Sequence, residues 1–248
     1  MNPISSNTDI GGRVKSVLAE IAAACERAHR SPDAVTLVAV SKTHSADQVV
    51  EAIRAGVRHL GENRLEEALP KMAAVSQLDA PPANWHMIGT VQSRKARQVL
   101  DGFSLLHSLD DVKLAERLSR FLVEQDRSLE VLMEINISGE MSKHGWQAYG
   151  WQHELLVRQA LWDDVAHLLA LPGLRVRGLM TMAPIVDDPE QARPVFKALC
   201  ELRAALANDF PAASWSELSM GMTDDYPVAV EEGATLVRVG RAIFGVRF

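Results

Sequence analysis

The sequence predicts an α/β protein folded as a single (β/α)8 TIM barrel that spans residues 1–248. Short apolar runs rich in β-branched residues alternate with amphipathic helical segments, and the alternation repeats eight times. The length of 248 residues suits one such barrel, because about 250 residues is typical of the fold. No linker or low-complexity stretch divides the chain. An open doubly wound sheet is the alternative that the same alternation allows.

Each predicted element follows from the spacing of apolar residues. Strands are expected at residues 36–41, 57–61, 85–89, 105–108, 129–137, 174–182, 215–219 and 235–239. Helices or helical turns are expected after them at 45–55, 64–75, 93–100, 111–124, 153–171, 189–207 and 227–232. Residues 14–30 form an amphipathic segment before the first strand, which predicts an extra N-terminal helix. The loop at 138–152 should lie on the functional face of the barrel.

Composition narrows the classes of partner. The chain is 47% hydrophobic with a formal net charge of -6, and an acidic balance argues against general nucleic-acid binding. Cys25 and Cys200 have no metal-ligand or redox spacing, which favours buried free thiols in a reducing compartment. There is no signal-peptide pattern and no apolar stretch of about 18 residues. We therefore expect a cytoplasmic protein that binds neither nucleic acid nor membrane.

Lys42 is the first candidate for chemistry, because active residues of this barrel lie at the C-terminal ends of its strands. It follows the first strand and shares a face with Val38 and Val40. If that face points into the barrel, Lys42 is partly desolvated, which lowers its pKa and frees an amine for Schiff-base formation. The alternative is a surface lysine that begins a loop.

Polar residues also mark the next strands. Asn63 ends the second strand and could hydrogen-bond in the site or cap the following helix. His86, in the third strand, reads more simply as a core histidine than as a catalyst. Glu134 and Asn136 share a face of the fifth strand that should point inward, and a buried carboxylate needs a partner such as a nearby cation, Lys42 or an arginine.

The last two strands indicate a phosphate site. The loops after strands seven and eight usually hold phosphate in this barrel. Ser219 offers a hydroxyl, and Gly221 and Gly240 let backbone N–H groups approach an anion, although simple turn chemistry also explains each glycine. Arg238 alternates with valines and should point inward, where a ligand or Glu134 would satisfy it. With the amine at Lys42, these groups favour a phosphorylated aldehyde as ligand.

Seven stretches give the chain a family resemblance. They are AVSKTHSADQVVEAIRAG, HLGENRLEEALPK, WHMIGTVQSRKAR, INISGEMSKHG, VRGLMTMAP, LSMGMTDD and GATLVRVGRAIFG. They follow one another from residue 39 to residue 245, and together they are highly specific. The sequence resembles the pyridoxal phosphate homeostasis proteins, which are single-domain relatives of the N-terminal barrel of alanine racemase.

The resemblance implies pyridoxal 5′-phosphate (PLP) as cofactor and assigns roles by position. It makes Lys42 the residue that forms the covalent aldimine, with Asn63 near the cofactor ring and Arg238 facing the pyridine nitrogen. It makes Ser219, Gly221, Gly240 and Arg241 the phosphate contacts, the last two through backbone N–H groups. Arg241 is a departure, because the family often has Thr or Ser there. Its guanidinium could replace the hydroxyl contact or point to solvent. Residues 145–170 also look longer and more aromatic than the family pattern.

The same resemblance favours a carrier over a catalyst. An arginine beside the pyridine nitrogen disfavours its protonation and weakens the electron sink that PLP enzymes use. Racemases share this arginine, but by resemblance they take a second base from an added β-domain of the partner subunit. This sequence ends at Phe248, directly after the predicted barrel, and neither Tyr149 nor Tyr226 lies in a racemase-like motif.

We therefore expect a monomer that binds PLP and acts as carrier and buffer in vitamin B6 homeostasis. It would release PLP by transimination, with apo PLP-enzymes as acceptors. One alternative is a weak PLP-dependent amino-acid racemase. The other is a barrel enzyme that acts on a sugar phosphate through a lysine Schiff base.

Overall fold

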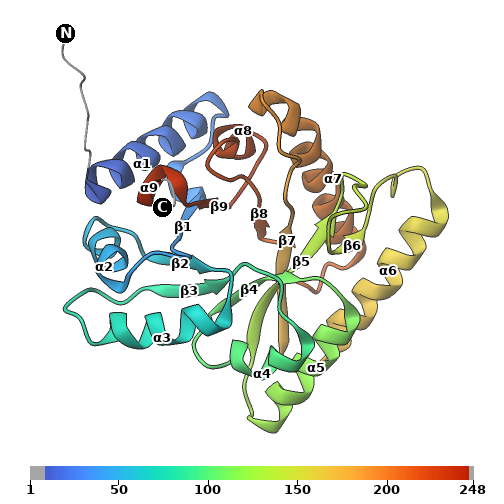
Figure 1. Ribbon diagram of the computed structural model, residues 1–248. Coiled ribbons are helices and arrows are strands. Elements are labelled where there is room, and N and C mark those ends of the chain that lie inside the picture. Colours follow the sequence, from blue (N-terminus) through green and yellow to red (C-terminus); the bar gives the residue numbers. More distant parts are fainter. Residues whose placement is uncertain (1–8, 246–248) are drawn as a thin grey trace.

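The computed structural model describes residues 9–245 and confirms a closed parallel barrel (Figure 1). Eight strands pair in the circular order β1–β2–β3–β4–β5–β7–β8–β9, and β9 pairs in turn with β1. A short β6 lies on the outer side of β5. The strands are β1 (Thr36–Val40), β2 (His59–Glu62), β3 (Asn84–Met87), β4 (Leu105–Leu109), β5 (Leu129–Asn136), β6 (Trp146–Gln147), β7 (Leu174–Met180), β8 (Glu217–Ser219) and β9 (Leu236–Val239).

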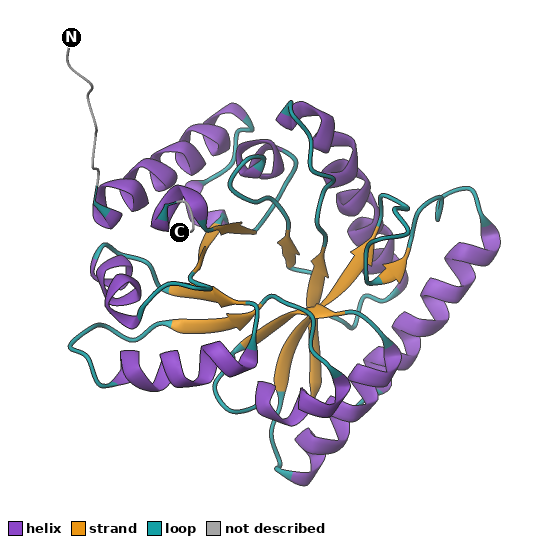
Figure 2. Ribbon diagram, in the orientation of Figure 1, coloured by secondary structure: helices purple, strands orange, loops and turns teal. Residues whose placement is uncertain are grey.

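Helices surround the strands (Figures 1 and 2). They are α1 (Ile10–Arg27), α2 (Ala46–Arg54), α3 (Leu65–Ser76), α4 (Ala96–Val99), α5 (Val112–Glu124), α6 (Leu155–Ala170), α7 (Arg193–Asp209), α8 (Tyr226–Glu231) and α9 (Arg241–Phe244), with short 3-10 turns at Pro32–Ala34, Ser93–Lys95 and Pro189–Ala192. Local signals explain their starts. Ser45 and Gln48 form a capping box on α2, and the Asp111 carboxylate accepts from the Leu114 N–H at the start of α5.

The predicted N-terminal helix is present as α1, which starts earlier and ends earlier than the sequence pattern indicated. Asp9 caps it by accepting from the Gly12 N–H, and His29 adopts a left-handed φ of 54° just beyond its end. The helix packs against α2, α8 and α9. Arg13 Nε donates to the Ile243 carbonyl at 2.6 Å, so α1 is tied to the last turn of the barrel.

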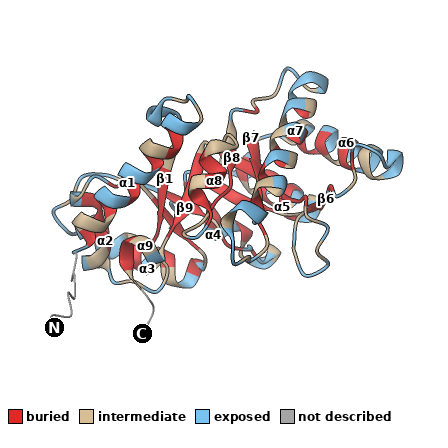
Figure 3. Cartoon of the chain, turned by 90° about the horizontal axis from the view of Figure 1, so that it is seen from above, coloured by how far each residue is buried: buried red, intermediate tan, exposed pale blue. Residues whose placement is uncertain are grey.

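The barrel interior is a small apolar cluster separate from the main core. It consists of Val38, Leu105, Leu132, Met180 and Leu236, which come from five different strands. The larger cluster lies between the outer faces of the strands and the helices, and buried residues concentrate there (Figure 3). Since Val38 points inward, the face of β1 that carries it leads to the functional end of the barrel, as the alternation predicted.

The loop after β5 departs from the expected pattern, because it contains β6. Trp146 and Gln147 pair in parallel with Ile135 and Asn136 of β5. A two-residue strand is too short for alternation to be visible in a sequence. The aromatic residues that follow support α6 from outside, since the rings of Trp151 and Trp162 stack with centroids 5.7 Å apart.

The sequence predicted buried free thiols and no membrane-spanning segment. Cys25 is a buried free thiol, as predicted, and Cys200 is a half-buried one. Among residues 9–245, no helix has the length and apolar character needed to cross a membrane.

Candidate functional site

Lys42 lies in the turn that follows β1, at the C-terminal end of the barrel. The Ser41 N–H donates to the Gly61 carbonyl at 3.0 Å, so the turn begins against the end of β2. Thr43 has a left-handed φ of 69°, which is unusual for a β-branched residue and points to a constrained turn. Lys42 itself is half-buried in this turn.

A buried cluster of charged side chains around Lys71 bonds to the backbone of this turn. Lys71 Nζ donates to the Ser41 carbonyl at 2.7 Å, to Glu62 Oε1 at 2.7 Å and to Glu67 Oε1 at 2.8 Å. The Ser41 hydroxyl donates to Glu62 Oε1 at 2.7 Å, and the Thr43 N–H donates to the Glu67 carboxylate. Burial raises the pKa of Glu62, which the bonds from Lys71 and Ser41 oppose. The sequence did not single out these residues, although HLGENRLEEALPK contains three of them.

Asn63 lies in the loop after β2, beside the Lys42 turn. It does not cap α3, because the N-cap residue is Arg64 and no side chain caps that helix. The capping alternative is therefore wrong. The Asn63 Oδ1 atom is buried and accepts no hydrogen bond within the described part of the chain. Because a buried acceptor normally finds a donor, this atom fits a ligand group that donates to it.

Arg238 points into the barrel, as predicted, and the residue is 5% exposed. Its Nη1 donates to Ser219 Oγ at 2.6 Å and its Nη2 donates to the Thr181 carbonyl at 2.9 Å. Glu134 was one expected partner, but between residues 9 and 245 the guanidinium makes no direct ion pair with it; Asp225 and Glu134 act on it at longer range. Burial lowers the pKa of Arg238 to about 10, which leaves it cationic at neutral pH.

In residues 9–245, backbone N–H groups without an acceptor lie in the segments that follow β8 and β9. In the region that the structure describes, no acceptor is bonded to the N–H of Gly221, Gly240 or Arg241. Gly221 has φ +90°, and a Cβ there would lie 2.6 Å from the Ala229 Cβ, so only glycine fits. A Cβ on Gly240 would lie 3.4 Å from the backbone oxygen of Val40. Gly240 therefore lies next to the end of the strand that leads to Lys42, whereas Gly221 lies against α8.

Of the two expected positions of the Arg241 guanidinium, a phosphate contact or the solvent, the structure shows the second. Its side chain is 57% exposed and pairs with the carboxylate of Asp224. Its backbone N–H starts α9 and is the group available to an anion.

Glu134 and Asn136 both lie buried on the inward face of β5, as predicted. The Asn136 amide holds the loop beyond it, because its Nδ2 donates to the Glu140 carbonyl at 2.8 Å and its Oδ1 accepts from the Gly139 N–H at 3.0 Å. Burial raises the pKa of Glu134 to about 7, with a further upward contribution from Asp110.

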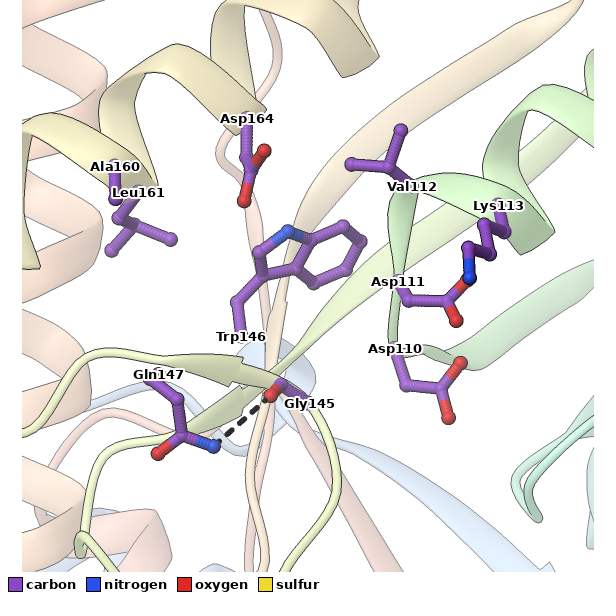
Figure 4. Close-up of a pocket in the computed structure, with 10 residues that line it drawn as sticks. All are labelled: Asp110, Asp111, Val112, Lys113, Gly145, Trp146, Gln147, Ala160, Leu161 and Asp164. Atoms are coloured by element: carbon purple, nitrogen blue, oxygen red, sulfur yellow. Dashed lines mark hydrogen bonds between the residues drawn. The ribbon is translucent and has the colours of Figure 1, made fainter.

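A separate cavity lies between α5, α6 and β6 (Figure 4). It has a volume of about 410 Å³, and Trp146 lies among the carboxylates of Asp110, Asp111 and Asp164, with Lys113 beside them. Three carboxylates against one ammonium disfavour an anionic ligand. The donor set after β8 and β9 is therefore the better candidate for a phosphate.

His86 is a core histidine with its hydrogen bonds satisfied, as the simpler interpretation held. Its ring bonds to His59 on one side and to His107 on the other. Sequence reasoning missed His107, whose ring bonds to Ser219. The available signal was its position two residues after Leu105, on the inward face of a strand that also contains three leucines.

Comparison with known proteins places this barrel in a class. The family model described as "Alanine racemase, N-terminal domain" matches residues 17–248. The pyridoxal phosphate homeostasis protein of Aquifex aeolicus is 37% identical over 235 residues, which cover 95% of this chain and 97% of that protein. The protein of the same name from Escherichia coli K12 is 37% identical over 240 residues, with coverage of 96% and 97%.

Solved structures agree. PipY of Synechococcus elongatus PCC7942 has been solved without PLP, with a TM-score of 0.81 and 36% identity, and with PLP bound, with a TM-score of 0.79 and 35% identity. In both cases the match covers 96% of this chain and all of PipY. This chain therefore belongs to the family of pyridoxal phosphate homeostasis proteins.

Proposed function

We propose that this chain binds PLP and serves intracellular vitamin B6 homeostasis as a carrier and buffer rather than as a catalyst. Lys42 would bind the cofactor's aldehyde carbon, and Asn63 would lie near its ring. Ser219 and the backbone N–H groups of Gly221, Gly240 and Arg241 would hold the phosphate. Family membership supports the cofactor, since PipY is a relative solved with PLP bound.

The observation that carries the proposal is that Lys42 lies at the same end of the barrel as the N–H groups after β8 and β9 that are unbonded in the described chain. Strands β8, β9, β1 and β2 are consecutive neighbours in the barrel. Their C-terminal ends supply Ser219, Gly240, Lys42 and Asn63, in that order. Three unbonded N–H groups and a buried acceptor at these strand ends support a phosphorylated aldehyde as the ligand. The cofactor, when bound, supplies a reactive aldehyde and an electron-accepting ring.

In this proposal, the residues of the protein position the cofactor and do not use it to transform a substrate. The cluster around Lys71 fixes the backbone on both sides of Lys42, and Arg238 fixes the Ser219 hydroxyl. Arg238 stays cationic at neutral pH, so a pyridine nitrogen beside it would resist protonation. That environment favours holding the cofactor over using its ring as an electron sink, which supports a carrier that supplies apo PLP-enzymes.

Absorbance of the purified protein tests cofactor attachment. With PLP added, we expect a band near roughly 420 nm, a property of the cofactor bound to an amine, that borohydride removes while PLP mass remains on the Lys42 peptide. Lys42→Ala should lose the band. Lys197→Ala, at an exposed position on α7, is the matched control and should keep it. An unchanged band in Lys42→Ala would show that another residue holds the aldehyde.

Two measurements separate carrier from enzyme. Amino acids incubated with the PLP-loaded protein in deuterated water should keep their α-hydrogen; Lys42-dependent exchange would support racemase-like chemistry instead. Deleting the gene should change the pools of free PLP and of amino acids, and unchanged pools would contradict a homeostatic role. Sedimentation at micromolar concentration should give the mass of one chain, 27.2 kDa.

A further inference from the structure

Three histidines form a hydrogen-bonded chain through the barrel interior. His59 Nδ1 lies 3.0 Å from His86 Nε2, and His86 Nδ1 lies 2.8 Å from His107 Nε2. His107 Nδ1 lies 2.8 Å from Ser219 Oγ, which also accepts from Arg238 Nη1 at 2.6 Å. The chain thus joins a residue at the start of β2 to the serine at the end of β8.

The two ends of this chain face different environments. His107 and Ser219 are fully buried, and His86 is 3% exposed. His59 is half-buried and lines a cavity of about 260 Å³ formed by residues at the N-terminal ends of the strands, among them Thr36 and Asn84. That cavity is at the opposite end of the barrel from Lys42 and Gly240.

Counting protons leaves two ordered arrangements. Burial lowers the pKa of His86 to about 3 and that of His107 well below its usual value, so both rings are neutral. A neutral imidazole has one N–H donor and one acceptor nitrogen. In the first, the Ser219 hydroxyl donates to His107 Nδ1, His107 Nε2–H donates to His86, and His86 Nε2–H donates to His59. The remaining proton of His59 is then on Nε2, which faces the cavity. If His59 Nδ1–H donates to His86, every bond reverses and His107 Nδ1–H donates to Ser219.

Only the reversed arrangement leaves the Ser219 hydroxyl proton available to a ligand. In that arrangement Ser219 Oγ accepts from both Arg238 and His107, so its O–H can donate to an anion. The same arrangement leaves His59 Nε2 as an acceptor in the cavity, where it can take a proton from water and keep its bond to His86. In the other arrangement, a proton on His59 Nδ1 would face the Nε2–H of His86.

We propose that His107 and His86 are positioning residues that couple a phosphate dianion on Ser219 to a proton on His59 at the other end of the barrel. This inference rests on the proposed function, because it takes Ser219 as a phosphate contact. No covalent bond changes except N–H and O–H bonds. As the chain reverses, the Ser219 proton passes to His107, the Nε2 protons of His107 and His86 pass one ring onward, and His59 becomes a cation. Ser219 regains a proton from a monoanionic ligand or from water, so the sum of protons is conserved.

Charged groups from several elements face His59 and set the pH at which it titrates. Glu217 of β8 raises its pKa, and burial, the larger effect, lowers it. Glu130 of β5 and Arg177 of β7 line the same cavity and pair with each other at 3.6 Å. His86 adds a ring from β3. Protonation of His59 and binding of an anion at Ser219 both favour the reversed arrangement. The affinity for the anion should therefore rise as the pH falls, and the bound anion should raise the pKa of His59 in return.

Sulfate is the appropriate probe, because it stays a dianion over the whole range from pH 5.5 to pH 8. We expect the cofactor-free protein to bind sulfate about fivefold or more tightly at pH 5.5 than at pH 8. Calorimetry in buffers of different ionisation enthalpy should show proton uptake on binding. His59→Gln should retain the pH 8 affinity and lose most of the rise. His153→Gln, an exposed histidine in the turn before α6, is the control and should match the unmodified protein.

A second readout needs no variant. Nitrogen-15 NMR of the unmodified protein should show His86 and His107 change from Nε2–H to Nδ1–H when sulfate is added. Sulfate that binds in a Ser219-dependent way with neither a tautomer change nor a loss of pH dependence in His59→Gln would overturn the coupling and leave the phosphate site standing. Absence of Ser219-dependent sulfate binding at every pH would overturn the proposed phosphate site and the coupling with it.

Discussion

Ionisation of the buried Glu134 carboxyl opposes folding. Its folded-state pKa of about 7 lies above the ordinary value of 4.5, because burial disfavours the charged form. A raised folded-state pKa contributes stability below pH 4.5 that is lost as the pH rises to 7. Glu134→Gln should therefore raise the free energy of unfolding at pH 8 by up to about 3 kcal/mol.

Urea unfolding at pH 8 and at pH 5 measures this effect. The gain from Glu134→Gln should shrink strongly at pH 5, where the unmodified carboxyl is protonated in the folded protein. Glu130→Gln on the same strand is the control, since Glu130 is 47% exposed and should change stability little at either pH. An equal gain at both pH values would mean that ionisation of Glu134 is not its cause.

At this scale, the sequence predicts the face on which a residue lies but not its partner across the barrel. Alternation along β9 correctly placed Arg238 inside. It could not show that Ser219, rather than Glu134, receives the guanidinium, because that depends on how the inward layers meet. His107 and Ser219 are 112 residues apart, and no local pattern joins them. The assigned roles of Lys42, Asn63 and the phosphate donors stay predictions until the cofactor is measured on them.

Among the elements, α3 is bonded directly to the Lys42 turn. Lys71 sits on α3 and bonds to groups of the turn after β1 and of β2. Removing one partner of a buried ion pair costs about 3–5 kcal/mol, because the other charge stays buried. We expect Lys71→Met to destabilise the protein by that amount in urea unfolding and to weaken PLP binding. Adding Glu62→Gln should recover part of the stability.

Lys95→Met provides the matched comparison. Lys95 pairs with Glu66 of α3, the helix that carries Lys71. The Lys95 and Glu66 side chains are 28% and 59% exposed. An exposed pair contributes about 0–1 kcal/mol, so this variant should be nearly as stable as the unmodified protein. Similar losses in the two variants would indicate that burial of the Lys71 cluster is not the source of its effect.

The elements of the repeating strand–helix pattern were predictable from the sequence, and the strand outside that pattern, β6, was not. The eight barrel strands and α1 all appeared where apolar spacing placed them, with ends shifted by a few residues. β2 extends from His59 to Glu62 rather than 57–61, because the strand pairs with β1 and β3 through those residues. β6 was missed, since pairing with β5 creates it and its own sequence does not.

For the whole molecule, ligand binding should appear as stability. A ligand that binds the folded state alone stabilises it by about 2.7 kcal/mol at one hundred times its dissociation constant. PLP at that excess should raise the free energy of unfolding by this amount. Pyridoxal at the same concentration should raise it much less, because it lacks the group that the donors after β8 and β9 would hold. Equal effects of the two compounds would argue against a phosphate site.

The pairing of β1 with β9 closes the barrel between its first and last strands. Thr36 of β1 lies opposite Leu236, about two hundred residues later in the chain. During synthesis on the ribosome, Lys42 emerges long before Gly240 and must wait for β9 before its neighbours are complete. If Lys42 and Gly240 bind the two ends of the cofactor as proposed, a nascent chain that lacks β9 would offer only one of these two contacts, and complete binding would require the folded barrel.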